Sequence, residues 1–180
     1  DHDCTLEASP GGPPDRQRLH PRHREMAADI RTVHAIRLGL RQVKGIGEKE
    51  TGAIMEARGS GYRSIREFWL RTGLSRGALE HLADADAFRS IGLGRREALW
   101  QVRGLEAGDR RAALPLFDRS GLGDPVNEPV TRLPQMPAGE EVIQDYRALS
   151  LSLRNHPVAF LRDELARRGV VECSAIETLA

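Results

Sequence analysis

The stretch that decides the fold is Leu40-Arg41-Gln42-Val43-Lys44-Gly45-Ile46-Gly47-Glu48-Lys49-Glu50-Thr51-Gly52-Ala53-Ile54. Two glycines flank one apolar residue, so the backbone can turn sharply while Ile46 points back into a core. Val43 before the turn and Ile54 after it are apolar positions at which two short helices can pack. The pattern predicts the end of one helix, a tight hairpin and the start of a second helix.

This hairpin is also a candidate anion site. Backbone amides that face outward at a helix N-terminus favour a phosphate oxygen, and nearby Lys and Arg side chains add positive charge. Such contacts hold a phosphate without reading base sequence. The candidate residues are Arg41, Lys44, Gly45, Ile46, Gly47 and Lys49. A nucleotide-binding loop is disfavoured, because the stretch contains neither Gly-x-Gly-x-x-Gly nor Gly-x-x-x-x-Gly-Lys-Ser/Thr.

A second hairpin is predicted from an internal repeat. After a shift of 28 residues, Gly45-Ile46-Gly47 falls on Gly73-Leu74-Ser75, and Arg76 follows. Two such hairpins related by a pseudo-twofold would touch phosphates on both strands across the minor groove of a duplex, so we add Gly73, Ser75 and Arg76 to the candidate DNA-binding residues. The alternative is a helical core in which these glycines are only turns.

Helices are predicted around and after the hairpins. Ser64 and Glu67 fit a capping box that begins a helix over about 64–72, and Gly73 ends it. Ser75 can cap the next helix, which runs to about Ala85, and a further helix covers about 95–103. We interpret Trp69 and Trp100 as core or half-buried anchors.

A separate helical stretch follows residue 140. Glu140 and Glu141 lie in its first turn, where the helix dipole favours acidic groups, and neither is expected to be catalytic. Its apolar face is predicted to hold Val142, Tyr146, Leu149 and Leu153. His156 is predicted to cap a last helix that begins at Pro157, with Val158, Leu161 and Leu165 facing inward.

The fold class is therefore all-α, with tandem hairpins followed by a linker and a small helical segment. Pro-rich stretches divide the chain into a tail and flexible linker over 1–33, the hairpin domain over 34–117, a linker over 118–139 and a helical segment over 140–180. Few residues in the Pro-rich stretches can be buried.

Charge and composition narrow the function. The net charge of the whole chain is only +1. Residues 16–76, however, carry 14 Lys+Arg against 6 Asp+Glu, a net charge of 14 − 6 = +8, which suits a polyanion partner. No apolar run approaches the ~20 residues of a membrane span, and the N-terminus lacks a signal-peptide layout, so we expect no membrane partner and a cytoplasmic location. Cys4 and Cys173 have no zinc or disulfide spacing.

The run His34-Ala35-Ile36-Arg37-Leu38-Gly39-Leu40-Arg41-Gln42-Val43-Lys44-Gly45-Ile46-Gly47 closely resembles the helix-hairpin-helix region of C-family bacterial DNA polymerases, the family of the DNA polymerase III alpha subunit. Asp86-Ala87-Phe88-Arg89-Ser90 and Leu151-Ser152-Leu153-Arg154-Asn155-His156-Pro157-Val158 are similar to the error-prone branch of that family. The resemblance covers about 34–117 and 134–171.

The resemblance implies that this chain is a fragment of a DNA-directed DNA polymerase, a nucleotidyltransferase acting in damage-induced mutagenesis and translesion synthesis. The catalytic aspartates and the expected Mg²⁺ would belong to a palm domain outside the fragment, which would itself lack catalytic residues, a metal site and a cofactor. An OB domain would follow. The fragment would grip duplex DNA behind the primer terminus.

A sliding clamp is a further partner that the resemblance implies. Ala113-Leu114-Pro115-Leu116-Phe117 occupies the place of the family's clamp-docking segment, so Leu114, Leu116 and Phe117 are candidate clamp-binding residues. Ala113 replaces the glutamine expected at the first position. The alternative is that Leu116 and Phe117 pack at the edge of the domain.

Two other functions stay open at this point. One is a helix-hairpin-helix module of a DNA repair enzyme, although no catalytic lysine follows the first hairpin. The other is a protein-interaction adaptor that docks on the sliding clamp. The salt dependence of binding distinguishes the adaptor from the polymerase fragment, because affinity that comes from phosphate contacts falls steeply as the salt concentration rises.

Overall fold

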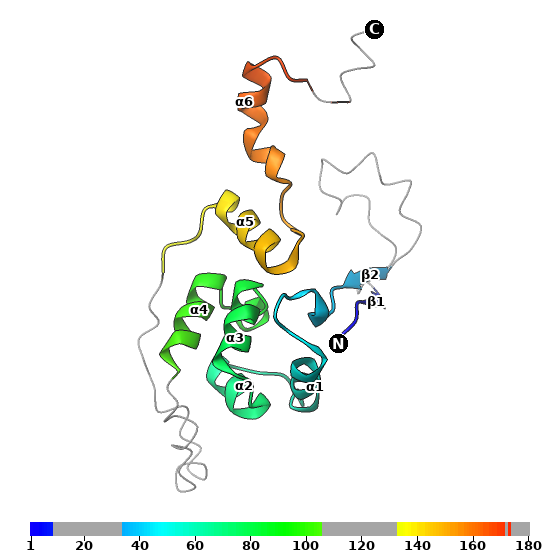
Figure 1. Ribbon diagram of the computed structural model, residues 1–180, viewed down its shortest axis with the longest axis vertical. Helices are drawn as coiled ribbons and strands as arrows, with labels where there is room; N and C mark the ends of the chain where they lie inside the picture. The colour runs from blue at the N-terminus through cyan, green and yellow to red at the C-terminus, as the bar shows by residue number, and fades with distance from the viewer. Residues whose placement is uncertain (9–33, 106–132, 172, 174–180) are drawn as a thin grey trace, which may run out of the picture.

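The computed structural model describes residues 1–8, 34–105, 133–171 and 173. The predicted all-α class is confirmed, because six α-helices dominate the described residues and strand content is small (Figure 1). The predicted clamp segment, with Leu114, Leu116 and Phe117, lies outside the described residues, as do most of the predicted linkers.

Four helices form the body of the molecule. They are α1 (Glu48–Glu56), α2 (Ile65–Thr72), α3 (Arg76–Asp84) and α4 (Arg95–Gly104). Their starts follow local signals: the Ser64 side chain accepts from the Glu67 amide, and the Ser75 side chain accepts from the Ala78 amide. Gly73 ends α2 in the left-handed conformation. The helices predicted over 64–72, 75–85 and 95–103 are therefore present.

One apolar core lies between these helices. Ile65, Leu79, Ala83 and Val102 are fully buried. Phe68 packs edge-on against Tyr62 and Phe88, with ring centroids 4.7 and 5.4 Å away. Trp69 joins the core as predicted, but Trp100 is 59% exposed, because it projects from the side of α4 opposite to Ala98 and Val102.

Two strands form a small sheet that the sequence pattern did not predict. β1 (Thr5–Ala8) pairs antiparallel with β2 (His34–Arg37), with Thr5 opposite Arg37. The amides of Leu40 and Arg41 donate to the carbonyls of Asp1 and His2. Residues 1–8 therefore contact the hairpin unit, and in place of a helix before the first hairpin there is β2 and one 3₁₀ turn, η2 (Leu40–Gln42).

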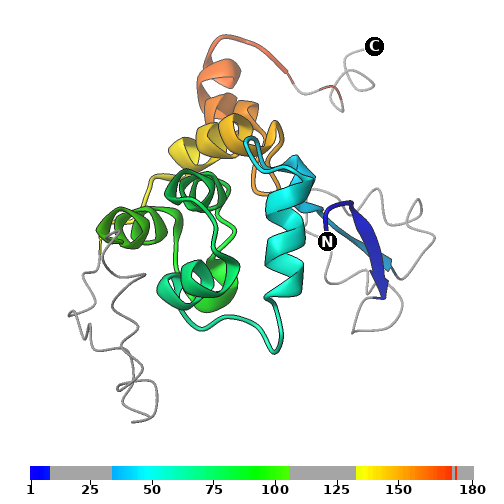
Figure 2. The same ribbon diagram turned by 60° about the horizontal axis from the view of Figure 1, so that its bottom comes forward.

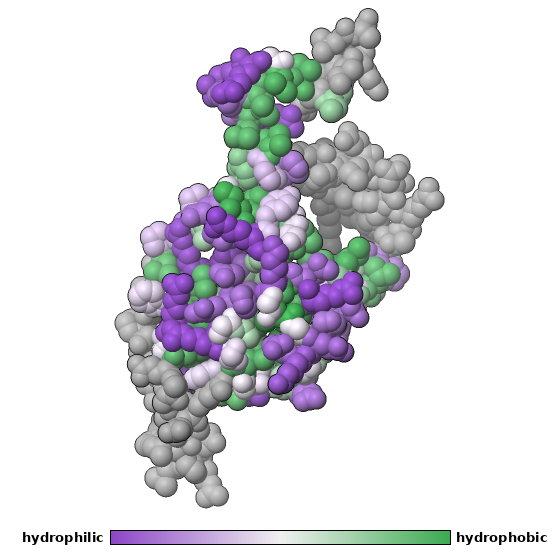
Figure 3. Space-filling view, in the orientation of Figure 1, coloured by the Kyte–Doolittle hydropathy of each residue, from purple (hydrophilic) through white to green (hydrophobic). Residues whose placement is uncertain are grey.

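The C-terminal part begins with α5 (Ala138–Leu149), which lies across the body (Figure 2). Ser150 ends α5 in the left-handed conformation, so Leu153 lies beyond the helix and is 78% exposed, contrary to the predicted face. The 3₁₀ helix η5 (Pro157–Leu161) follows, capped by His156 as predicted, and leads into α6 (Arg162–Arg167). Leu161, predicted to face inward, is exposed. Apolar residues are visible along this extension in Figure 3.

Candidate nucleic-acid interface

The turn of the first hairpin and the helix after it have the geometry that the sequence predicts, although β2 and a 3₁₀ turn precede the turn in place of a helix. The Val43 carbonyl accepts from the Ile46 amide at 3.1 Å, which closes a tight turn. Gly45 has φ = 84°, a conformation that favours glycine. Ile46 is buried in the core, and α1 begins directly after the extended Gly47. The predicted packing of Val43 and Ile54 into the same core is also found.

The amides of this hairpin are less free than the sequence suggested. The Lys44 amide donates to the Ala148 carbonyl of α5 at 3.0 Å, and the Ile46 amide is used by the turn. The Gly47 amide donates to the Glu50 carboxylate at 3.1 Å. The first-turn amides of Glu48 and Lys49 have no acceptor inside the helix, because helix geometry gives them none. The surface available to a phosphate is therefore shifted from Lys44 toward the first turn of α1.

The basic side chains of the first hairpin are exposed. Arg41 pairs with Asp3 at 2.7 Å, and Lys44 Nζ donates to the Tyr146 carbonyl at 3.4 Å. The Lys49 side chain is exposed, and its ammonium has no hydrogen-bond or ion-pair partner among the described residues. Lys49 is thus the cation of this group most available to a phosphate.

The predicted second hairpin, Gly73-Leu74-Ser75, joins α2 to α3. Gly73 has φ = 66° and Leu74 is buried, as in the first hairpin. The Arg76 guanidinium, however, donates to the Arg103 carbonyl and lies 3.8 Å from the Glu80 carboxylate. Arg76 is therefore engaged with α4 and its own helix.

A closer structural match to the first hairpin is Gly92-Leu93-Gly94, which was not predicted from the 28-residue repeat. Gly92 has φ = 82°, against 84° at Gly45, and each hairpin follows a 3₁₀ turn, here η3 (Arg89–Ile91). The Gly94 amide donates to the Glu97 carboxylate at 2.9 Å, as the Gly47 amide does to Glu50. A usable signal was present in the sequence, because in both places Gly-apolar-Gly is followed by Glu three residues later.

Arg95 and Arg96 open α4 directly after this hairpin. The Arg96 guanidinium is partly exposed and pairs with Glu140 at 3.2 Å. Since Arg96 is the second helical residue after Gly94, it corresponds to Lys49 after Gly47. A cavity of about 730 Å³ opens beside the hairpin and is lined by Gly92, Gly94, Arg89 and Arg96 among others.

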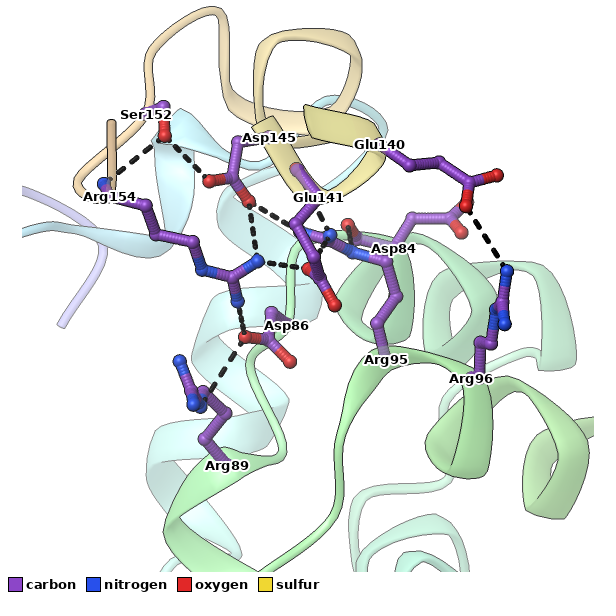
Figure 4. A network of polar contacts seen from close by, with 10 residues as sticks. All are labelled: Asp84, Asp86, Arg89, Arg95, Arg96, Glu140, Glu141, Asp145, Ser152 and Arg154. Carbon is purple, nitrogen blue, oxygen red and sulfur yellow. Dashed lines mark hydrogen bonds and ion pairs between the residues drawn. The ribbon is translucent and has the colours of Figure 1, made fainter. Parts of the chain in front are cut away.

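A charged network joins the start of α4 and the α3–α4 connection to α5 and to the segment after α5 (Figure 4). Arg95 is 2% exposed and pairs with Glu141 and Asp145 of α5. Arg154 pairs with Glu141 and with Asp86 in the α3–α4 connection. Burial raises the pKa of the Asp86 carboxyl, and the charges of Arg154 and Arg89 offset part of that rise. Glu140 and Glu141 are first-turn charges as predicted, and they also serve as ion-pair partners.

Neither a metal-binding cluster nor a membrane-spanning helix is found in the described ranges. They contain no group of three or more His, Cys, Asp or Glu side chains arranged to hold a metal ion. None of their helices is long and apolar enough to cross a membrane.

Comparison with known proteins identifies the class. The family model described as helix-hairpin-helix motif matches residues 2–98, so the chain belongs to the helix-hairpin-helix family. No solved structure matches it.

The most informative relatives are all error-prone DNA polymerases. The chain is 52% identical over 171 residues to error-prone DNA polymerase 1 of Rhizobium meliloti (strain 1021), covering 95% of this chain and 15% of the relative. It is 54% identical over 168 residues to the error-prone DNA polymerase of Mesorhizobium japonicum, covering 93% and 15%. It is 44% identical over 183 residues to that of Caulobacter vibrioides, covering 99% and 16%. The resemblance to the error-prone branch is confirmed, and the chain spans about 15% of the length of the first two relatives.

Proposed function

We propose that this chain is the non-sequence-specific duplex DNA-binding region of an error-prone DNA polymerase. The observation that carries the proposal is the pair of matching hairpins, Gly45-Ile46-Gly47 and Gly92-Leu93-Gly94, each followed by a helix whose first-turn amides lack an intrahelical acceptor. Family membership and the relatives' names point to the same function.

The proposed phosphate contacts are the first-turn amides after each hairpin, with Lys49 and Arg96 beside them. Gly45 and Ile46 shape the first hairpin, and Arg41 and Lys44 add charge at its edge. Gly73, Ser75 and Arg76 are left out of the proposed surface, because the Gly92–Gly94 turn matches the first hairpin more closely than the Gly73–Ser75 turn does. Backbone-to-phosphate contacts are blind to base sequence, which suits a polymerase that moves along its template.

The chemistry of the longer polypeptide is part of the same proposal. It would be a DNA-directed DNA polymerase using Mg²⁺, acting in damage-induced mutagenesis and translesion synthesis, and located in the cytoplasm. The ion would bind in a catalytic domain elsewhere in that polypeptide, and the present chain would hold the duplex without taking part in phosphoryl transfer. Docking on a sliding clamp through Leu114, Leu116 and Phe117 stays a prediction.

Fluorescence anisotropy of a labelled primer–template, titrated at several salt concentrations, tests the DNA-binding function. We expect salt-dependent binding, because phosphate contacts release counterions, with weaker binding to single-stranded DNA. Absence of binding at low salt would overturn the proposal and favour a protein-interaction role.

Matched variants locate the contact. Gly47→Leu and Gly94→Leu place bulk in front of the first-turn amides, and both glycines have extended backbone that accepts a side chain. Within 4 Å, a Cβ at Gly47 would meet only the side-chain carboxylate of Glu50, at 3.0 Å. Gly52→Leu is the control, because a Cβ there points into open space on α1. Both hairpin variants are expected to lose affinity while Gly52→Leu keeps it.

A further inference from the structure

Helix α5 is attached to both hairpins. Toward its C-terminal end, the Ala148 carbonyl accepts from the Lys44 amide at 3.0 Å, and the Tyr146 carbonyl accepts from Lys44 Nζ at 3.4 Å. Toward its N-terminal end, Glu141 and Asp145 bind Arg95, the residue directly after Gly94. One helix therefore touches both hairpins.

All three guanidinium nitrogens of Arg95 have hydrogen-bond acceptors. Arg95 Nε donates to the Asp84 carbonyl at 2.8 Å, and one terminal nitrogen donates to Asp145 Oδ1 at 2.5 Å. The other terminal nitrogen donates to the Glu141 carbonyl at 3.3 Å and to its carboxylate. Ser152 Oγ donates to the second oxygen of Asp145 at 2.8 Å. Figure 4 shows these groups converging from α4, α5 and the segment after α5.

A buried ion network is weak evidence for stability. Well-packed apolar residues of similar volume often stabilise a protein as much or more, because the charges need not be desolvated. A network with fixed donors and acceptors does, however, hold the groups that it joins in one defined arrangement. This network lies between the Gly92–Gly94 hairpin and α5, the helix that touches the other hairpin. The arrangement that it holds is therefore the position of the two hairpins relative to each other.

We propose that α5 is a brace that fixes the separation of the Gly45–Gly47 and Gly92–Gly94 hairpins so that both grip one duplex, and that Arg95 is its positioning residue. Ala148 comes seven residues after Glu141 on the helix, which is about 10 Å along the axis. That length is comparable to a minor groove about 6 Å wide together with the phosphates on its two walls. The inference rests on the proposed DNA-binding function.

The brace predicts bivalent binding. When two hairpins are held at the right separation, binding of one hairpin to its DNA strand places the other hairpin at high effective concentration near the second strand. Loss of either hairpin then sharply lowers the affinity of the protein for the duplex. Without the brace, each hairpin binds nearly independently, and loss of one hairpin costs little. Coupling between the hairpins is therefore the property that distinguishes a positioning role from a merely structural one.

The experiment measures that coupling by anisotropy with the 180-residue chain and a labelled duplex. Gly47→Leu is introduced into the wild type and into Arg95→Met. We expect Gly47→Leu to weaken binding about tenfold or more in the wild type and about twofold in Arg95→Met, because effective concentration multiplies affinity only while the hairpins are held together. The slope of log affinity against log salt should also fall in Arg95→Met, since fewer phosphates are contacted at once.

Control variants distinguish loss of the brace from loss of charge and from misfolding. Arg103→Met removes the same charge from the exposed C-terminal end of α4 and should keep both the salt slope and the coupling. Glu141→Gln keeps the size of the side chain and an acceptor, so it serves if Arg95→Met does not fold, and it should lower the coupling in the same direction. A folded Arg95→Met or Glu141→Gln protein with wild-type slope and coupling overturns the brace while leaving the DNA-binding function intact. A wild type that does not bind duplex overturns both.

Discussion

The imidazole of His81 lies directly against the backbone of Gly45. A Cβ built on Gly45 would be 2.5 Å from His81 Cδ2 and 2.6 Å from Nε2, and Gly45 also has φ = 84°. Two independent constraints, a left-handed backbone and a neighbouring ring on α3, therefore require glycine at this position. The first hairpin is fixed by α3 as well as by its own turn.

Gly45→Ala is accordingly expected to destabilise the fold. A non-glycine residue in this conformation costs about 1–3 kcal/mol, and the His81 ring must also move. Thermal unfolding followed by circular dichroism should show a lower Tm. Gly52→Ala is the matched control, since its Cβ meets nothing, and replacing a helix-interior glycine should raise stability by about 0.5–1 kcal/mol. Equal stability of the two variants would contradict the constraint at Gly45.

Glu67 gives the fold a pH dependence of known sign. The Arg63 amide donates to its carboxylate at 2.9 Å and Arg71 pairs with it at 2.8 Å, and these contacts hold the pKa of Glu67 below its usual value of 4.5. A lowered folded-state pKa means stabilisation that is present above the unfolded-state pKa and lost as the pH falls through the folded-state pKa. Glu67→Gln should therefore be less stable than the wild type near pH 7. The difference in Tm should shrink as the pH falls below 4.5, and a difference that is constant with pH would contradict this account.

The helices of the body could be predicted because their signals are local. Ser64, Ser75 and Gly73 lie within one turn of the helix ends that they determine, and five consecutive residues determine the turn of the first hairpin. The prediction of which backbone amides of that hairpin are free to bind phosphate was less accurate. The Lys44 amide is bound by Ala148, which is more than 100 residues away, and no local pattern reports such a contact.

The second hairpin shows a different limit of sequence reasoning. Gly92-Leu93-Gly94 shares with the first hairpin a second glycine and a glutamate three residues after it, which Gly73-Leu74-Ser75 lacks, but no local pattern reports the tertiary contacts that follow it. Arg95 reads as an ordinary exposed charge at a helix start, yet it is 2% exposed, because Glu141 and Asp145 cover it from 46 and 50 residues away. The pairing of β1 with β2 is likewise non-local, which explains why it was not predicted.

Glu140 is expected to weaken duplex binding. Its carboxylate lies 3.2 Å from the Arg96 guanidinium, the counterpart of Lys49 at the other hairpin. Glu140→Gln removes a charge that competes with phosphate for Arg96, so affinity should rise about two- to fivefold and the salt slope should steepen by about one phosphate contact. Anisotropy at two salt concentrations measures both quantities. Glu164→Gln on α6 changes the net charge equally at a distance from the hairpins, and an equal gain there would assign the effect to overall charge.

Arg71 holds the loop between α1 and α2 in place. Its guanidinium donates to the carbonyls of Ala57, Arg58 and Gly61 and lies 4.7 Å from the centroid of the Tyr62 ring. Removing it leaves three carbonyls without this donor and one ring without its cation.

We expect Arg71→Met to lower the free energy of unfolding by about 1–3 kcal/mol, since several charge-assisted hydrogen bonds are lost together. Arg63→Met makes the same change in charge on an exposed side chain of the same region and should cost less than about 0.5 kcal/mol. Urea denaturation of both variants measures the difference. If the two were equally stable, the loop would be held by its own turns, and the guanidinium of Arg71 would be incidental to it.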